Sequence, residues 1–106
     1  MGQMSTKNIR ILENLQKGLV SSGNSYNPEE LLQNFNELER SYEPEEENFQ
    51  KACAWILMCG FYLSEAEKQF QKALEKNPNL AKVIQNLKLL QSQKSYLQEF
   101  LQQIKF

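Results

Sequence analysis

The segment 45–62 carries apolar side chains around most of a helical circumference, and this feature restricts the fold more than any other. At about 3.6 residues per turn, one face holds Phe49, Cys53, Ile56, Leu57 and Gly60. A second face holds Ala52, Trp55, Met58 and Cys59. A helix with two apolar faces usually lies at the centre of a helical domain, where neighbouring helices cover both. We therefore expect 45–62 to be the central helix of an all-α domain.

The rest of the chain has helical periodicity and almost no strand signal. Only three Val or Thr residues occur, and no run of alternating β-branched residues is present. Asn27 before Pro28 is typical of a helix start, and Ser64-x-x-Glu67 has the form of a capping box. The sequence predicts a single helical domain, 1–106, of about five helices at residues 5–20, 28–42, 45–62, 64–77 and 79–104. The core-facing residues of the first two helices are expected to be Ile11, Leu12, Leu15, Leu19, Leu31, Phe35, Leu38 and Tyr42.

The residue types argue against catalysis and against a metal or cofactor site. The chain has no His and no Asp, so it lacks an imidazole base and the usual companions of a thiolate metal ligand. Cys53 and Cys59 are about 9 Å apart along one predicted helix, too far for a disulfide, and are expected to be small buried hydrophobic residues. The Gly residues are scattered and form no phosphate-binding loop. We expect no enzymatic activity, no cofactor and no metal.

No segment resembles a membrane span or a secretory signal. The longest apolar run, 52–63, is well short of the roughly 20 residues that a bilayer requires. The N-terminus lacks the apolar core of a signal peptide, so a cytoplasmic protein is expected. Residues 1–6, Met-Gly-Gln-Met-Ser-Thr, fit the N-myristoylation pattern. A chance match, or extra residues ahead of a native start at Met4, is the simpler interpretation.

The net charge of −1 is distributed unevenly along the chain. Residues 29–47 hold eight Glu and one Arg, whereas the Lys residues of 48–106 are spaced singly along the predicted helices. Nucleic-acid binding normally needs a concentrated basic face, which this spacing does not provide. We therefore expect neither a nucleic acid nor a membrane as partner. An acidic block is most often a solvated helix face.

The segment 64–79 contains a spacing that is typical of one repeat family. Ala66, Phe70, Ala73 and Pro78 are separated by four, three and five residues. Small residues let two helices approach closely, Phe fills the gap between them, and Pro ends the helix. The stretch 61–79 therefore resembles the second helix of a tetratricopeptide repeat, a helix–turn–helix unit of about 34 residues.

The resemblance weakens toward the N-terminus. Counting back from Pro78, the positions where the family prefers Trp, Leu, Gly and Tyr hold Gln50, Cys53, Ala54 and Leu57. A second register, with Trp55, Met58, Cys59 and Tyr62, has better aromatic spacing but lies too close to Ala66. Residues 5–44 resemble a degenerate first hairpin, 45–79 a second hairpin and 80–106 a C-terminal capping helix. The alternative is a compact helical bundle in which one hairpin matches by chance.

The resemblance implies a right-handed solenoid fragment that binds a peptide or a partner helix without catalysis. Its concave groove would be lined by Asn48, Lys51, Trp55 and Met58. Trp supplies a large contact area and Met adapts its shape, so both suit such a groove. Apolar stripes at helical spacing are equally typical of a core, and the sequence leaves open whether Trp55 and Met58 line a groove or the core.

Residues 80–104 carry apolar side chains at alternating spacings of three and four, the pattern of a coiled-coil seam. The seam consists of Leu80, Val83, Leu87, Leu90, Leu97, Leu101 and Ile104, with Lys94 as its polar member. The pattern fits a long closing helix that covers the bundle. It also fits a homodimer or a hetero-coiled coil through residues 90–106, with an interface formed by Leu90, Leu97, Leu101 and Ile104.

These patterns together predict a small, non-enzymatic interaction protein, an adaptor or assembly factor whose partner is another protein. The alternative is a compact helical bundle that acts as an inhibitor, an immunity-type protein or a small subunit of a larger assembly through its acidic 29–47 face. The two hypotheses place the partner on different surfaces, the groove beside Trp55 or the acidic segment.

Overall fold

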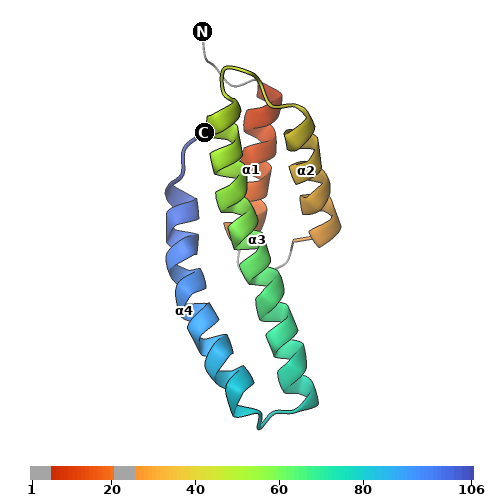
Figure 1. Ribbon diagram of the computed structural model, residues 1–106, viewed down its shortest axis with the longest axis vertical. Coiled ribbons are helices and arrows are strands. Elements are labelled where there is room, and N and C mark those ends of the chain that lie inside the picture. Colours follow the sequence, from red (N-terminus) through yellow and green to blue (C-terminus); the bar gives the residue numbers. More distant parts are fainter. Residues whose placement is uncertain (1–5, 21–25) are drawn as a thin grey trace.

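Four α-helices that alternate in direction make up the structure, a computed structural model that describes residues 6–20 and 26–106. They are α1 (Thr6–Val20), α2 (Pro28–Arg40), α3 (Glu47–Lys76) and α4 (Ala81–Gln103) (Figure 1). No strand occurs in the described ranges, so the predicted all-α class is confirmed. The myristoylation pattern and most of the loop predicted after residue 20 lie outside the described residues.

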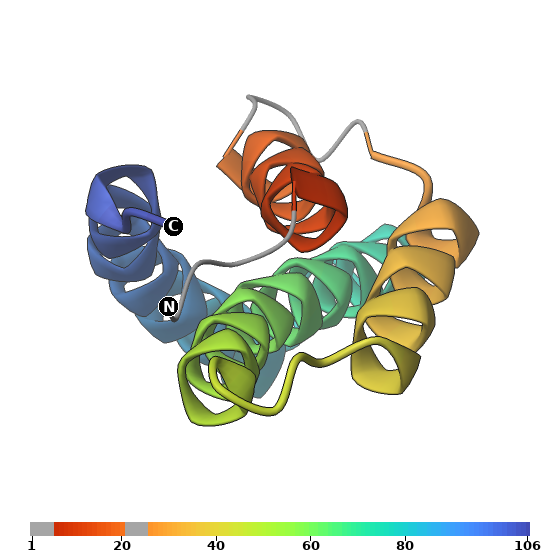
Figure 2. The same cartoon turned by 90° about the horizontal axis from the view of Figure 1, so that it is seen from above.

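Helix α3 contacts each of the other three helices, as α1 also does. It packs most extensively against α4 and also against α1 and α2. Seen from above, α1 lies on one side of α3, while α2 and α4 flank it (Figure 2). No described helix lies on the side of α3 that faces away from α1 (Figures 1 and 2). The predicted central helix is therefore covered on one side only.

The core forms where α1, α2 and the first half of α3 meet the end of α4. Its fully buried leucines are Leu12, Leu15, Leu38, Leu57 and Leu101. Burying a Leu side chain completely stabilises the fold by about 1.5–3 kcal/mol. Phe61 packs against Phe35 and Tyr26, with ring centroids 6.1 and 5.8 Å apart. All the core-facing positions expected on α1 and α2 are buried, and Tyr42, just after α2, is partly buried against the same core.

The predicted helix boundary at Ser64 is wrong, and the chain has four described helices rather than five because 45–62 and 64–77 join into α3. Ser64 is 1% exposed and lies inside the helix. The buried residues of α3 recur every three or four positions with no change of phase at Ser64: Gln50, Cys53, Ala54, Leu57, Gly60, Phe61, Ser64 and Glu67. A continuous inner face favours a continuous helix. Residues 45–79 therefore do not contain the turn of the expected helix–turn–helix pair.

The ends of α2 and α3 follow the predicted signals. The Asn27 side-chain oxygen accepts hydrogen bonds from the backbone N–H groups of Glu29 and Glu30, at 3.0 and 3.4 Å, which confirms the predicted N-cap. Asn77 is the C-cap of α3, and its backbone N–H donates to the carbonyl of Ala73. Pro78 follows at once, where the chain turns back into α4.

Helices α3 and α4 extend beyond the other two as a two-helix hairpin (Figure 1). At 30 residues, α3 is about 45 Å long, twice the length of α1. Within this hairpin the Lys94 ammonium donates to Glu67 Oε1 at 2.7 Å, and Gln91 Nε2 donates to Glu67 Oε2 at 3.2 Å. Both charged side chains are 11% exposed. The polar member of the α4 seam is thus matched by a buried carboxylate on α3.

The predicted self-association seam packs within the chain. Leu101 belongs to the core, Leu97 and Ile104 pack against it, and Leu90 is half-buried. Gly60 permits the close approach of α4, because a methyl group added there would lie 2.8 Å from Leu101 Cδ1. In this fold the seam residues contact their own chain, so an interface between two copies through them would require α4 to leave the core.

Two groups of hydrogen bonds connect α1 and the two ends of α2 to α3. The buried Asn8 amide nitrogen donates to Gln50 Oε1 at 3.1 Å and to the Ser41 carbonyl at 2.9 Å. At the other end of α2, the Tyr26 hydroxyl donates to Glu65 Oε2 at 2.6 Å, and Lys68 donates to the same oxygen at 2.9 Å. Burial tends to raise the pKa of Glu65, but the hydrogen bonds from Tyr26 and Lys68 outweigh it, so the pKa is lowered.

The Glu67–Lys94 pair predicts strongly non-additive mutant stabilities. Glu67→Met or Lys94→Met alone leaves a charge in a mostly buried site, and each should lower the free energy of unfolding by about 3 kcal/mol. The double variant should lie within about 1 kcal/mol of wild type, because well-packed apolar residues replace the pair. Urea unfolding of all four proteins measures this coupling. The exposed Glu47–Lys51 pair is the control and should show coupling below about 0.5 kcal/mol. Additive losses at 67 and 94 would contradict the pairing.

Glu65 predicts a pH-dependent contribution to stability. Its folded-state pKa is lowered, so the stabilisation is complete above the unfolded-state pKa of about 4.3 and is lost as pH falls through the folded value. Glu65→Gln should therefore be less stable than wild type at pH 7, and the difference should shrink below about pH 4. Urea midpoints measured from pH 7 down to below pH 4 test this, with Glu75→Gln, an exposed site on α3, as the control. A difference that grows on acidification would contradict the assignment.

Candidate apolar docking face on helix α3

The side of α3 that faces away from α1 carries an apolar stripe, which is exposed except at its last member, the half-buried Ala66. Its members are Ala52, Trp55, Cys59, Tyr62 and Ala66, at alternating spacings of three and four. Trp55 is 71% exposed and Tyr62 is 58% exposed. This alternation is the spacing at which one helix packs along another. We call these five residues the outer stripe.

A groove between α2 and α3 leads onto the outer stripe. Its volume is about 300 Å³, and its described lining is Leu32, Phe35, Asn36, Glu39, Tyr42, Lys51, Ala54, Trp55 and Met58. A second hollow of about 380 Å³ lies along α3 itself and is lined by Trp55, Met58, Cys59, Tyr62 and Leu63. Trp55 and Met58 line both, so the groove and the stripe form one surface.

Three of the four predicted groove residues meet in this groove. Lys51, Trp55 and Met58 are part of its lining, whereas Asn48 is exposed about one turn earlier on α3 and is not part of the described lining. The exposure of Trp55 answers the question that the sequence left open, because so accessible a side chain is not core. Met58 does both: it packs against the core and lines the groove.

The α2 wall of the groove was missed by sequence reasoning. Leu32, Asn36 and Glu39 lie on the face of α2 next to its buried stripe. The available signal was Leu32, which is apolar yet falls outside the Leu31, Phe35 and Leu38 spacing of the core. Cys59 and Tyr62 did appear in the sequence as a register that competed with the repeat assignment, and they belong to the outer stripe instead.

One end of the groove is polar and electronegative. Burial, followed by the charges of Glu39 and Glu47, raises the pKa of Tyr42. Lys51 lies 3.6 Å from Glu47 Oε1 and 5.8 Å from the centre of the Tyr42 ring. The cation that lines the groove is therefore already held by a carboxylate, whereas Glu39 has no ion pair with any described residue.

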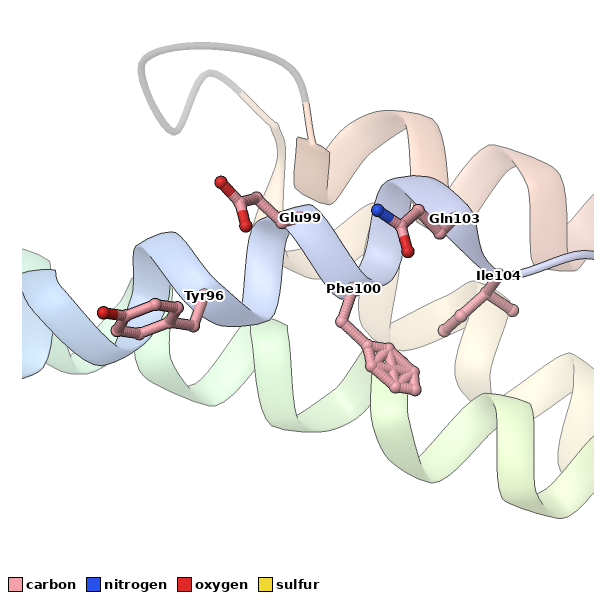
Figure 3. A pocket seen from close by; sticks show the side chains of 5 residues that line it. All are labelled: Tyr96, Glu99, Phe100, Gln103 and Ile104. Carbon is pink, nitrogen blue, oxygen red and sulfur yellow. The ribbon is translucent and has the colours of Figure 1, made fainter.

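A further hollow of about 500 Å³ lies on α4. Its described lining, Tyr96, Glu99, Phe100, Gln103 and Ile104, comes from the last turns of α4 and its C-cap. Tyr96 and Phe100 lie along one side of the helix, and Glu99 and Gln103 along the other (Figure 3). All of its described residues come from one element, so within the described ranges this hollow has no second wall, unlike the α2–α3 groove.

Within residues 6–20 and 26–106, no three His, Cys, Asp or Glu side chains lie close enough together to hold a metal ion. Burial raises the pKa of the Cys53 thiol, which keeps it protonated and unreactive. Cys59 is exposed, contrary to the expectation that both cysteines are buried. The described helices include none with the length and apolarity needed to cross a bilayer.

Comparison with family models, with curated proteins and with solved structures finds no match to this chain. The tetratricopeptide resemblance therefore stays a prediction from the spacing of its residues. What the molecule does has to be inferred from its own surface.

The exposure of Trp55 predicts that its removal leaves the fold intact. Trp55→Ala should change the free energy of unfolding by less than about 1 kcal/mol, because few contacts with the core are lost. Leu57→Ala, two residues away on the buried face, should cost about 2–5 kcal/mol. Urea unfolding followed by circular dichroism compares the two variants. A loss for Trp55→Ala as large as that for Leu57→Ala would show that Trp55 is core.

Proposed function

We propose that the protein is a non-enzymatic interaction module that binds another protein across the α2–α3 groove and the outer stripe. The observation that carries this proposal is the outer stripe itself: an aromatic, apolar surface on the most heavily packed helix, uncovered by any described part of the chain. Contiguous exposed apolar surface of this kind is typical of interaction sites in soluble proteins.

The residue types on this surface suit a binding anchor. Trp and Tyr are enriched among the residues that contribute most to interface affinity, because their large rings lose much water-accessible area for little conformational entropy. Trp55 stands at the junction of the groove and the second hollow, next to Met58, whose flexible thioether adapts to a partner's shape. A partner that covers Trp55 would contact both parts of the surface.

The tetratricopeptide resemblance supports the same class of function, an adaptor or assembly factor. In that family the first helices of the repeats form the concave groove. Here the groove lies between α2 and α3, and the segment expected to form a hairpin is one helix. The function is proposed from the surface, and the resemblance adds to it.

The second candidate is an inhibitor, an immunity-type protein or a small subunit that binds through the acidic 29–47 face. The exposure of Glu29, Glu30 and Glu39 on α2 favours it. Charge reversal at Glu29 and Glu30, which are exposed and lie outside the described groove lining, should weaken binding through the acidic face and should leave binding at the outer stripe nearly unchanged. The two candidates are therefore separable by mutation.

Affinity capture with matched variants tests the proposed function. Wild type and Tyr96→Ala, which removes an exposed aromatic residue on α4, should retain the same protein from a native lysate. Trp55→Ala should lose it, since truncation of an interface anchor costs at least about 2 kcal/mol, or roughly thirtyfold in affinity. Quantitative mass spectrometry of the three samples gives the ratios. Equal recovery with all three proteins would contradict binding at this surface.

A further inference from the structure

We propose that the α2–α3 groove binds an amphipathic helix of a partner protein that carries Lys or Arg along the edge facing α2. The apolar side of that helix would pack on Trp55 and Met58, and its cations would face the glutamates of α2. This inference rests on the proposed function and names the partner's chemistry.

The dimensions of the groove fit a short helix. Leu32 and Glu39 mark the two ends of the groove wall that lies on α2, and Tyr42 follows just after the helix. The rise of about 1.5 Å per residue makes this wall about 10 Å long, which matches about two turns of a partner helix lying along the groove. The outer stripe continues beside it at the spacing by which helices interlock.

The groove has two ends of different chemistry. Leu32, Met58 and Trp55 make the end nearer the second hollow apolar. The other end holds Tyr42 and Glu39, and burial, followed by the charges of Glu39 and Glu47, raises the pKa of Tyr42. A helix that fits this gradient needs apolar residues at i, i+3 or i+4, and i+7, with cations flanking them toward the Tyr42 end.

The charges around the groove favour a basic partner. Residues 29–47 carry a net charge of −7. Glu37 pairs with Lys7 of α1 at 3.2 Å, and Glu47 holds Lys51 at 3.6 Å, so neither Lys neutralises Glu39. A partner cation placed opposite Glu39 would add attraction and would speed association, because complementary charge steers the encounter.

The same charges disfavour a second copy of this chain. A two-fold axis that sets two α3 helices antiparallel, face to face, places each acidic α2 next to the α2 of the other copy. In the parallel arrangement α2 lies next to α4, whose exposed charged residues are Lys82, Lys88 and Glu99. Neither arrangement places a concentrated positive charge opposite the glutamates of α2.

Binding of three designed peptides tests the inference, with Trp55 as the reporter. Trp55 is the single Trp of the chain, so a Trp-free ligand that covers it should shift its emission to shorter wavelength. The peptides are helices of about fourteen residues that share one Leu face. All positions outside this face are Lys in the first peptide, Gln in the second and Glu in the third. The Lys peptide should bind at least about tenfold more tightly than the Gln peptide, and more tightly still than the Glu peptide. Its affinity should fall as salt is raised, because surface charges are screened.

Two charge reversals of equal size locate the contact. Glu39→Lys should weaken binding of the Lys peptide about tenfold. Glu30→Lys is the matched control on the same helix. Glu30 lines a separate hollow between α1 and α2, so its reversal should change the affinity by less than about twofold. Circular dichroism should show unchanged helix content for both variants.

Three other outcomes would contradict the inference, and each would point to a different property of this surface. Equal binding of the three peptides, with no effect of Glu39→Lys, would leave an apolar groove without charge selection and would leave the proposed function standing. A mass near twice 12.4 kDa in light scattering, with Trp55 already shielded, would make a second copy the occupant. A Trp55 shift with vesicles of mixed zwitterionic and anionic phospholipids, and none with any peptide, would make a membrane the occupant.

Discussion

Helix α3 has two apolar faces, and the described part of the chain supplies neighbours for only one of them. The main features of the structure depend on this imbalance. Its inner face holds Leu57 and Phe61 against α1, α2 and the end of α4. Its outer stripe holds Trp55 and Tyr62 in solvent. Burying a large aromatic side chain is among the strongest gains available to a protein surface. A partner that supplies the missing neighbour would gain that energy without any change in the fold.

The hairpin of α3 and α4 is a scaffold whose register is set by polar contacts as well as by leucines. An apolar seam alone tolerates slippage of one helix along another, whereas a buried ion pair is satisfied in one register only. Glu67 and Lys94 form such a pair between the two helices, and Gln91 contributes a hydrogen bond to the same carboxylate. Asn8, Ser41 and Gln50 play the same part where α1 and α2 meet the start of α3. The Asn8 contacts connect the end of α2 to the start of α3, and these two helices form the walls of the groove.

The periodicity of the apolar residues was sufficient to predict the all-α class and most of the core. It gave a wrong helix boundary at Ser64, where one spacing is compatible with two structures. Ser64 and Glu67 are three residues apart, which is the spacing of a capping box and also that of two residues on one buried helix face. Assigning Glu67 to a cap hid its role as the partner of Lys94, although Lys94 stood out as the polar member of the α4 seam. The seam of Leu97 and Leu101 similarly fitted both a dimer and the chain's own core.

The candidate site was predictable in part, because periodicity identifies the side chains that share a helix face. Lys51, Trp55 and Met58 line one groove because they share one side of a helix, and their role in binding a partner stays a prediction. Which of two apolar faces remains uncovered depends on how many neighbours the fold supplies, and that number is a tertiary property. Glu39 and Leu32 escaped notice because their α2 surface becomes a wall only once α3 lies beside it.

Site-specific photo-crosslinking in the native lysate tests the central claim most directly. A photoreactive phenylalanine analogue in place of Tyr62 lies on the outer stripe, and the same analogue in place of Tyr96 lies on α4 with similar exposure. The account predicts a discrete crosslinked protein from position 62, lost when Trp55 is also changed to Ala, and none of that protein from position 96. The same crosslinked protein in equal yield from both positions, unaffected by Trp55→Ala, would contradict it.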